Sequence, residues 1–169
     1  MFNHTIFKQH FISVLCTAAM LTAFTLPAHA AEPGAIKVSS IVEKIIDVVD
    51  KDGKTVSTRV PADNAVPGDE IIYTTTFENI SNKPAGNIVI TNPVPNDTTY
   101  LMANGVNTEI TFSIDGGNEY AAADKLVVTT NEGDTRPALP SDYTHLRWTY
   151  KVELGVGETS KVSFRAVIK

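Results

Sequence analysis

A repeated alternation of apolar and polar residues is the feature that most constrains the fold of this chain. Turn-forming residues interrupt it about every 10 to 20 positions. In the clearest example, residues 144–154, apolar residues occupy every second position: Leu146, Trp148, Tyr150, Val152 and Leu154. Because successive side chains of a strand point to opposite faces, this pattern predicts a half-buried antiparallel strand. Several such segments between turns predict an all-β sandwich or barrel.

Similar patterns predict further strands over residues 70–80, 87–91, 109–114, 125–130 and 161–169. Asp52 and Gly53 tolerate the positive φ angles of a two-residue turn, so they predict a hairpin between two β-prone runs. Residues 40–49 allow two interpretations, since their apolar residues also fit a helical spacing, with Ser40 and Glu43 placed as a capping box. We favour a strand, because the segment is rich in β-branched residues and leads into the hairpin.

Residues 1–30 have the features of a secretory signal peptide. Lys8 precedes a mainly apolar run over residues 11–26, and Ala28-His29-Ala30 forms a cleavage site with small residues at both required positions. The apolar run is short for a membrane span, so we expect cleavage before Ala31 and no integral membrane segment in the mature protein. The predicted location is periplasmic or extracellular.

Cleavage changes the charge and the cysteine content of the chain. Loss of residues 1–30 from 169 leaves 139 residues, over 31–169, with 13 Lys and Arg against 19 Asp and Glu. This acidic excess disfavours nucleic acid and anionic membranes as partners, because both attract a positively charged surface. The mature part has no cysteine, so its fold depends on packing alone, which a domain of this size can provide.

Several motifs gather between residues 66 and 100. They are Val66-Pro67-Gly68-Asp69, Tyr73, Asn79, Asn87-Ile88-Val89-Ile90, Pro93-Val94-Pro95 and Thr98-Thr99-Tyr100. This part of the chain resembles the bacterial conserved-repeat domain, also called domain of unknown function 11. The resemblance is looser over residues 108–169, where Gly155-Val156-Gly157-Glu158 is similar to a family turn before the last strand. The resemblance implies an immunoglobulin-like β-sandwich of exported and cell-surface proteins, with no catalytic residues and no agreed ligand.

The residues of these motifs also have physical roles of their own. Gly68 and Asp69 predict a tight turn into the strand that holds Tyr73, and Pro93 and Pro95 end and rigidify the next strand. On the apolar face of its strand, Trp148 is large enough to fill the centre of a sandwich core. We therefore expect one immunoglobulin-like antiparallel β-sandwich of seven or more strands over residues 31–169. Many members of the family are long arrays, whereas this chain has one copy.

Nucleophilic catalysis finds little support in the sequence. His145 is the only histidine of the mature part, and it lies on the polar face of its predicted strand beside Arg147. A Ser-His-Asp unit needs a pocket and an orienting acid, and the sequence contains no G-x-S-x-G turn. One histidine without cysteine also argues against a zinc site. We expect His145 to be a surface residue and the protein to have no cofactor.

Two acidic segments contain residue types that can bind calcium. The first begins at Asp50, but positions five and twelve of a calcium loop would be Lys54 and Pro61, so a hairpin turn is favoured. The second contains Asp115, Asn118 and Glu119, which would bind calcium weakly with help from a neighbouring loop. We keep these three residues as weak calcium candidates.

Two further possibilities concern sugars and crosslinks. Tyr100, Tyr120 and Tyr143 are the aromatic residues not assigned to the core, so a sugar-stacking platform would depend on them. An internal Lys–Asn isopeptide bond would need a lysine and a catalytic acid together in the core, and Lys44 has Glu43 and Asp47 near it in sequence. Nothing specific in the sequence selects this second set.

These observations predict a non-enzymatic, exported module that has a structural or protein-binding role in the cell envelope. The expected partner is another envelope or surface protein, held through edge strands and loops, because edge strands carry unpaired backbone groups. The alternative is a carbohydrate-binding module of the same architecture, with polysaccharide as its ligand. Such a module would require a planar set of exposed aromatic rings.

Overall fold

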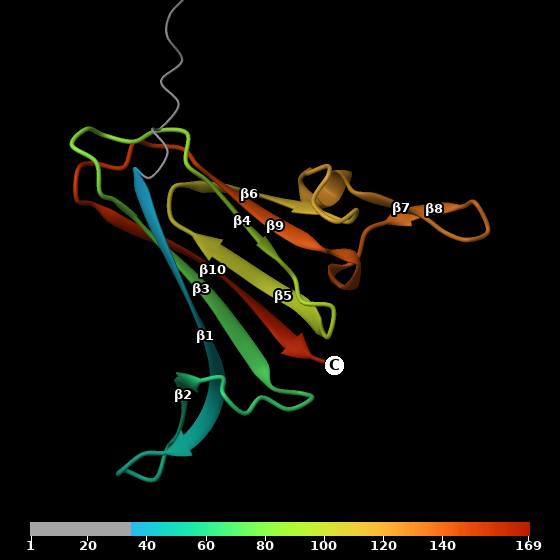
Figure 1. Ribbon diagram of the computed structural model, residues 1–169. Helices are drawn as coiled ribbons and strands as arrows, with labels where there is room; N and C mark the ends of the chain where they lie inside the picture. Colours follow the sequence, from blue (N-terminus) through green and yellow to red (C-terminus); the bar gives the residue numbers. More distant parts are fainter. Residues whose placement is uncertain (1–34) are drawn as a thin grey trace, which may run out of the picture.

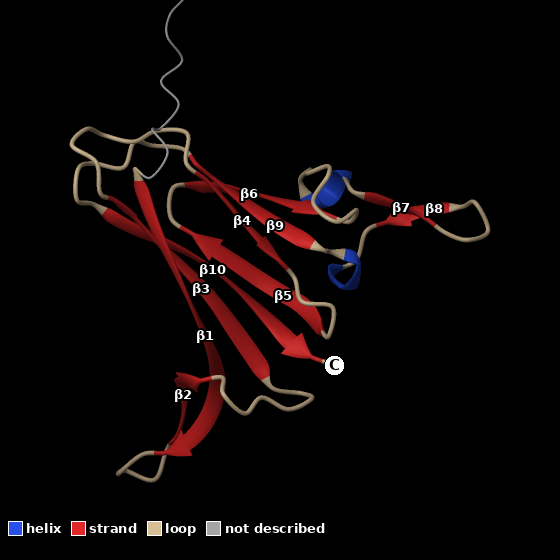
Figure 2. Cartoon of the chain, viewed as in Figure 1, coloured by secondary structure: helices blue, strands red, loops and turns tan. Residues whose placement is uncertain are grey.

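The computed structural model describes residues 35–169, and the predicted signal peptide lies outside this range. Two antiparallel sheets face each other in the described part (Figure 1 and Figure 2). The larger sheet has the order β2–β1–β3–β10–β5, and the smaller has the order β4–β9–β6. All the pairings between named strands are antiparallel, which confirms the predicted all-β, antiparallel sandwich class.

The larger sheet consists of β1 (Ile36–Val49), β2 (Thr55–Pro61), β3 (Glu70–Asn79), β5 (Thr98–Gly105) and β10 (Thr159–Ile168). The smaller consists of β4 (Val89–Pro93), β6 (Thr108–Ser113) and β9 (His145–Tyr150). A separate hairpin and two short 3₁₀ turns complete the fold: β7 (Val127–Thr129), β8 (Thr135–Pro137), η1 (Ala123–Lys125) and η2 (Pro140–Asp142). Among the described residues, no helix is long and apolar enough to cross a membrane.

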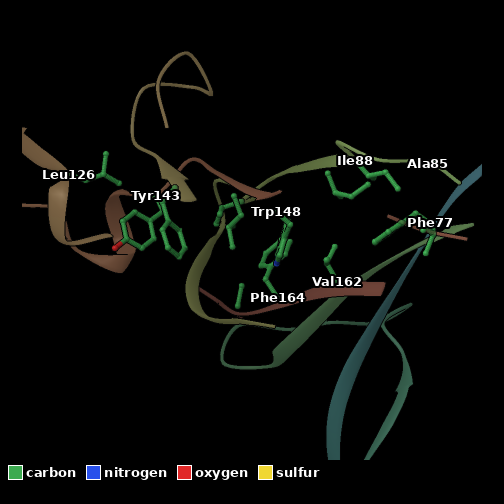
Figure 3. Packing of buried hydrophobic residues seen from close by; sticks show 14 residues of the cluster. Phe77, Ala85, Ile88, Leu126, Tyr143, Trp148, Val162 and Phe164 are labelled. Atoms are coloured by element: carbon green, nitrogen blue, oxygen red, sulfur yellow. The ribbon is translucent and has the colours of Figure 1, made fainter. Parts of the chain in front are cut away.

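Aromatic side chains from both sheets form the core (Figure 3). Trp148 on β9 is fully buried, and its ring centroid lies 6.4 Å from that of Phe164 on β10. Phe164 in turn stacks on Tyr73 of β3 at 4.6 Å. Trp148 thus occupies the centre of the sandwich, as its place on the apolar face predicts. Large aromatic side chains bury the most apolar surface per residue, so this cluster dominates the packing.

The predicted strand over residues 144–154 is too long. Leu146 and Trp148 are fully buried as expected, but β9 ends at Tyr150 and Val152 is exposed. Leu154 lies beyond the end of β9 and is nevertheless buried. It forms an isolated bridge with Ala85, with backbone N–H···O distances of 2.8 and 2.9 Å. The alternation continues in the sequence after the sheet pairing has stopped.

Residues 40–49 are strand, as favoured, and belong to β1. The turn after β1 differs from the predicted two-residue turn. Asp50 and Lys54 are the last paired residues, with Asp50 N donating to the Lys54 carbonyl at 2.8 Å, so three residues form the loop. Gly53, the third of them, has φ of 76°, and this left-handed residue after a β-turn is the usual form of a three-residue hairpin.

Part of the first hairpin extends beyond the sandwich. Pairing of β1 with β3 ends at Lys44, whereas pairing of β1 with β2 continues to Val49. We call residues 45–60 the arm. In Figure 1 the arm leaves the body of the molecule at the lower end of β1. None of its residues is fully buried, so its packing contributes little to the core.

Candidate functional site

An apolar groove lies beside the outer strand of the smaller sheet. Its walls come from Val42 on β1, Tyr73 on β3, Phe164 on β10, and the prolines Pro93 and Pro95 at the end of β4. Its volume is about 200 Å³, and no charged residue lines it. We call this site the groove. It exists because the five-stranded sheet is wider than the three-stranded sheet that faces it.

Three polar side chains of the groove, those of Ser40, Thr75 and Asn92, hydrogen-bond to one another. The Thr75 hydroxyl lies 3.2 Å from the Ser40 hydroxyl and accepts a hydrogen bond from Asn92 Nδ2 at 2.9 Å. Burial raises the pKa of Tyr73, and the negative charge of Asp97 raises it further, so the phenol is neutral at physiological pH. The Thr74 hydroxyl, also in the lining, is buried and has no hydrogen-bond partner among the described residues. With no ionised residue in its walls, the groove favours an apolar occupant.

The outer edge of β4 has no strand paired with it in the described part of the chain. Val94 N donates to the Thr144 carbonyl next to β9 at 2.8 Å. Since hydrogen bonding alternates along an antiparallel strand, the backbone groups of Val89 and Thr91 point away from β9. Pro93 offers only its carbonyl there. This edge lies directly against the groove, because Asn92 and Pro93 belong to both.

The turn motif at residues 67–69 lies outside the groove and has a structural role. Gly68, with φ of 92°, donates its N–H to the Ile168 carbonyl of β10 at 2.9 Å. The Asp69 carboxylate accepts hydrogen bonds from Val66 N and from Lys44 Nζ, both at 3.1 Å. These two contacts lower the pKa of Asp69. Pro67, Gly68 and Asp69 therefore hold the start of β3 against β1 and β10.

The structure brings three of the predicted motif residues together. Tyr73, Pro93 and Pro95 all line the groove, whereas Trp148 is buried in the core and Pro67, Gly68 and Asp69 form the turn. Sequence reasoning missed Val42 and Thr91. Val42 belongs to the β-branched segment 40–49, but the composition that predicts a strand there does not reveal which apolar face remains uncovered.

The weak calcium candidates form a self-contained loop. The Asp115 carboxylate accepts hydrogen bonds from the Ser113 hydroxyl at 2.6 Å and from the backbone N–H groups of Asn118 and Glu119 at 3.1 Å. The Ser113 contact is the main cause of a lowered Asp115 pKa. Asn118 Nδ2 also donates to the Asp115 carbonyl at 2.6 Å. Over residues 35–169, no group of three or more His, Cys, Asp or Glu residues could hold a metal ion.

The first acidic segment is a turn. Asp50 Oδ1 accepts hydrogen bonds at 2.9 Å from the backbone N–H groups of both Asp52 and Lys54. An aspartate that caps its own turn in this way is typical of hairpin connections. The favoured hairpin interpretation of this segment therefore agrees with the geometry.

His145 is half-buried and lies far from the arrangement that nucleophilic catalysis needs. Its Nδ1 atom lies 3.3 Å from the Thr144 hydroxyl, and among the described residues no carboxylate forms a hydrogen bond with the ring. Arg147 on the same face lies over the ring of Tyr120, with its guanidinium carbon 3.6 Å from the ring centroid. A catalytic histidine requires an orienting partner for its second nitrogen.

The three tyrosines considered for sugar stacking do not form an exposed platform. Tyr143 is buried and stacks on Phe112 with 4.5 Å between ring centroids, so its expected place off the core is wrong. Tyr100 contacts the edges of both of these rings. Arg147 covers one face of Tyr120. Tyr143 and Tyr100 are drawn into the core because β5, β6 and η2 meet there.

The residues considered for an isopeptide bond lie apart. Lys44 Nζ donates to Asp69 Oδ2 at 3.1 Å and to the Asn64 carbonyl at 2.8 Å. Glu43 and Asp47 are an odd number of positions away from Lys44 on the same strand, so their side chains lie on the opposite face of β1. The grouping by sequence proximity is therefore wrong.

No protein-family model matches this chain. No curated protein matches it either. The resemblance to the conserved-repeat domain thus rests on sequence motifs, which are most specific over residues 66–100.

Proposed function

We propose that this protein is a non-enzymatic binding module, exported to the periplasm or the cell surface, that holds another protein by strand addition at β4. The observation that carries this proposal is the open edge of β4 beside the apolar groove. Strand addition uses both features at once. Backbone hydrogen bonds to the edge supply affinity, and every second side chain of the added strand enters a pocket and supplies specificity.

The edge suits a short extended segment. Val89 and Thr91 each offer one N–H and one carbonyl, while Pro93 stops further donation at the end of the strand. Side chains of the added strand that point inwards would lie over Val42 and Tyr73, so a partner with alternating apolar residues is favoured. The predicted signal peptide and the resemblance to exported sandwich domains support a location in the envelope.

Site-specific crosslinking in cells tests the proposal. A photoreactive amino acid at Val42, which lies in the groove and is 44% exposed, is expected to crosslink to a protein. The same residue at Val152, which is equally exposed but outside the groove, is the matched control. Thr91→Pro removes one of the two outward N–H groups of β4, the one in the middle of the edge, and should abolish the product from Val42. Equal yields from the two positions, or products insensitive to Thr91→Pro, would contradict the proposal.

A further inference from the structure

We infer that the strand which occupies the groove belongs to a second copy of this chain, and that it is β2 of the arm. This inference rests on the proposed function and names its partner. Each chain has one groove and one arm, at different places on the molecule. A contact between unlike surfaces repeats from one molecule to the next, so it generates open chains or closed rings.

The arm has an apolar face that contributes no residue to the core of its own sandwich. One face of the hairpin carries Ile46, Val48, Val56 and Val60. Val48 and Val56 lie opposite each other, and Ile46 and Val60 are an even number of positions away from them on the same two strands. Val56 is 41% exposed. The other face carries polar contacts, such as the Ser57 hydroxyl donating to Asp47 at 2.7 Å. An isolated two-stranded hairpin with an exposed apolar face is only marginally stable in water.

The arm cannot reach the groove of its own molecule. β2 pairs edge to edge with β1 in one sheet, so within one molecule it cannot lie over the face of β1 that lines the groove. In addition, Val42 and Val48, the partner of Val56, are six positions apart on the same continuous strand. At about 3.3 Å per residue, an extended strand separates them by about 20 Å. The acceptor of the arm must therefore be a different molecule.

The free edge of β2 has the backbone groups that the edge of β4 needs. Ala62 N donates to the Val42 carbonyl at 3.2 Å, which sets the alternation of hydrogen bonding along β2. By that alternation, the N–H and carbonyl groups of Ser57 and Arg59 point away from β1. β2 has no second neighbour in the described part of the chain, so these groups are unpaired with any strand.

Antiparallel pairing of these two edges directs the apolar residues into the groove. Residues that exchange hydrogen bonds across an antiparallel pair lie opposite each other and share a face. Ser57 and Arg59 would thus lie on the same outer face as Thr91 of β4. Val56 and Val60, one position away, would point inwards over the groove. Parallel pairing would reverse this arrangement, so we assign the antiparallel orientation.

The apolar face of the arm and the groove are both uncharged surfaces, and the arm has two strands that can extend the smaller sheet. Between residues 45 and 60 its apolar face contains no ionised residue, and none lines the groove. Lys44, which lies on the same face opposite Val60, forms an ion pair with Asp69 of its own chain. Docking would place β2 and β1 of the second copy beside β4, which extends the three-stranded sheet by two strands. Val38 and Val42 on the inner face of β1 are 52% and 44% exposed, and the added strands would cover them.

The mass of the particles in solution tests this inference. The full chain, expressed and purified as the cell processes it, should form concentration-dependent chains or rings in analytical ultracentrifugation. Val56→Asp should weaken association by about 100-fold or more, because it places a carboxylate in an apolar groove. Val49→Asp is the matched control, since Val49 lies on the opposite face of the arm and is 70% exposed. It should leave association unchanged.

A mixing experiment identifies the two halves of the contact. Val56→Asp keeps an intact groove, and Thr91→Pro keeps an intact arm. Each variant alone should be monomeric, with the circular dichroism spectrum and melting temperature of the parent sandwich. Together they should form dimers that do not grow, because only one functional arm and one functional groove are present.

Two results would overturn the inference. In the first, the parent chain remains monomeric up to about 100 µM. In the second, Val56→Asp abolishes association while Thr91→Pro leaves it intact, which would indicate contact between two arms. If Val42 crosslinks to a different protein while the purified chain stays monomeric, the inference fails and the proposed binding function stands. If the chain associates through other surfaces and Val42 forms no product, both fail.

Discussion

At the residue scale, Asn79 shows how a single buried polar side chain organises this fold. It ends β3, is fully buried, and uses every hydrogen-bonding position of its carboxamide. Nδ2 donates to the carbonyls of Lys83 and Leu154, both at 2.8 Å, and Oδ1 accepts from the backbone and hydroxyl of Ser81 at 3.0 and 2.7 Å. Asn79 therefore ties the loop after β3 to the segment that precedes β10.

We expect Asn79→Ala to lower the free energy of unfolding by about 2–4 kcal/mol, because the substitution leaves several buried groups without partners. Urea unfolding measures this change. Asn104→Ala, on the exposed part of β5, is the matched control and should change stability by less than about 0.5 kcal/mol. Similar effects of the two substitutions would show that the Asn79 network contributes little.

A second residue-scale prediction concerns the ion pair of Asp142 and Arg136. Two hydrogen bonds of 2.6 and 2.9 Å join the two side chains, and the Leu139 backbone N–H also binds Asp142 at 2.7 Å. These contacts lower the pKa of Asp142 to about 2, and the hydrogen bonds from Arg136 are the main cause. A carboxyl whose pKa is lowered by folding stabilises the fold above its unfolded pKa of about 3.9, and this contribution is lost as the pH falls towards 2.

Asp142→Asn should therefore destabilise the protein at pH 5 by roughly 1 kcal/mol, since the pair is partly exposed to solvent. The difference between the variant and the parent should shrink as the pH is lowered to 2. Urea unfolding at the two pH values tests this. A difference that is independent of pH would mean that the charge of Asp142 has no role.

At the scale of elements, the arm is the part of the fold with the least support. It makes no contribution to the buried core and is held by pairing between β1 and β2 and by side-chain contacts within the hairpin. Gly53→Ala places a side chain at φ of 76°, although nothing lies within 4 Å of the new Cβ atom. The expected strain is about 1 kcal/mol.

Hydrogen exchange of backbone amides measures this strain where it acts. Arm amides should exchange faster than those of β3 and β10, and Gly53→Ala should accelerate exchange in the arm by about fivefold. Gly86→Ala is the control, because Gly86 lacks a positive φ and its added Cβ would meet Glu153 at an ordinary 3.8 Å. If Gly53→Ala accelerates exchange throughout the sandwich, the arm is not an independent unit.

Elements differed in how well the sequence predicted them. β1 was predicted as a strand because its β-branched residues outweigh their helical spacing. The turn after it was predicted one residue too short, since Asp-Gly occurs in both two- and three-residue loops and only the pairing of Asp50 with Lys54 distinguishes them. β5 escaped prediction because residues 98–105 do not alternate. Its pairing with β10 contains a register shift between Arg165 and Ala166.

At the scale of the whole molecule, the two sheets differ in width, and this difference underlies both proposals. Five strands face three, so part of the inner face of β1 has no sheet over it. The open edge of β4 borders the same region. A partner strand would satisfy the backbone of the edge and bury the apolar face in one step, which is the physical reason to expect binding there.

The alternating strands and the centre of the apolar core were determined by the sequence alone, because alternation with a period of two is a local property that each such segment carries in its own residues. Trp148, Tyr73 and Phe77 follow from it directly. Which apolar faces stay uncovered was decided only by the tertiary structure. Nothing in the sequence distinguishes Val42 and Tyr73 from apolar residues that are covered by the second sheet. The groove that they line depends on how many strands each sheet contains and where β4 ends. Those are properties of long-range pairing, which no single segment encodes.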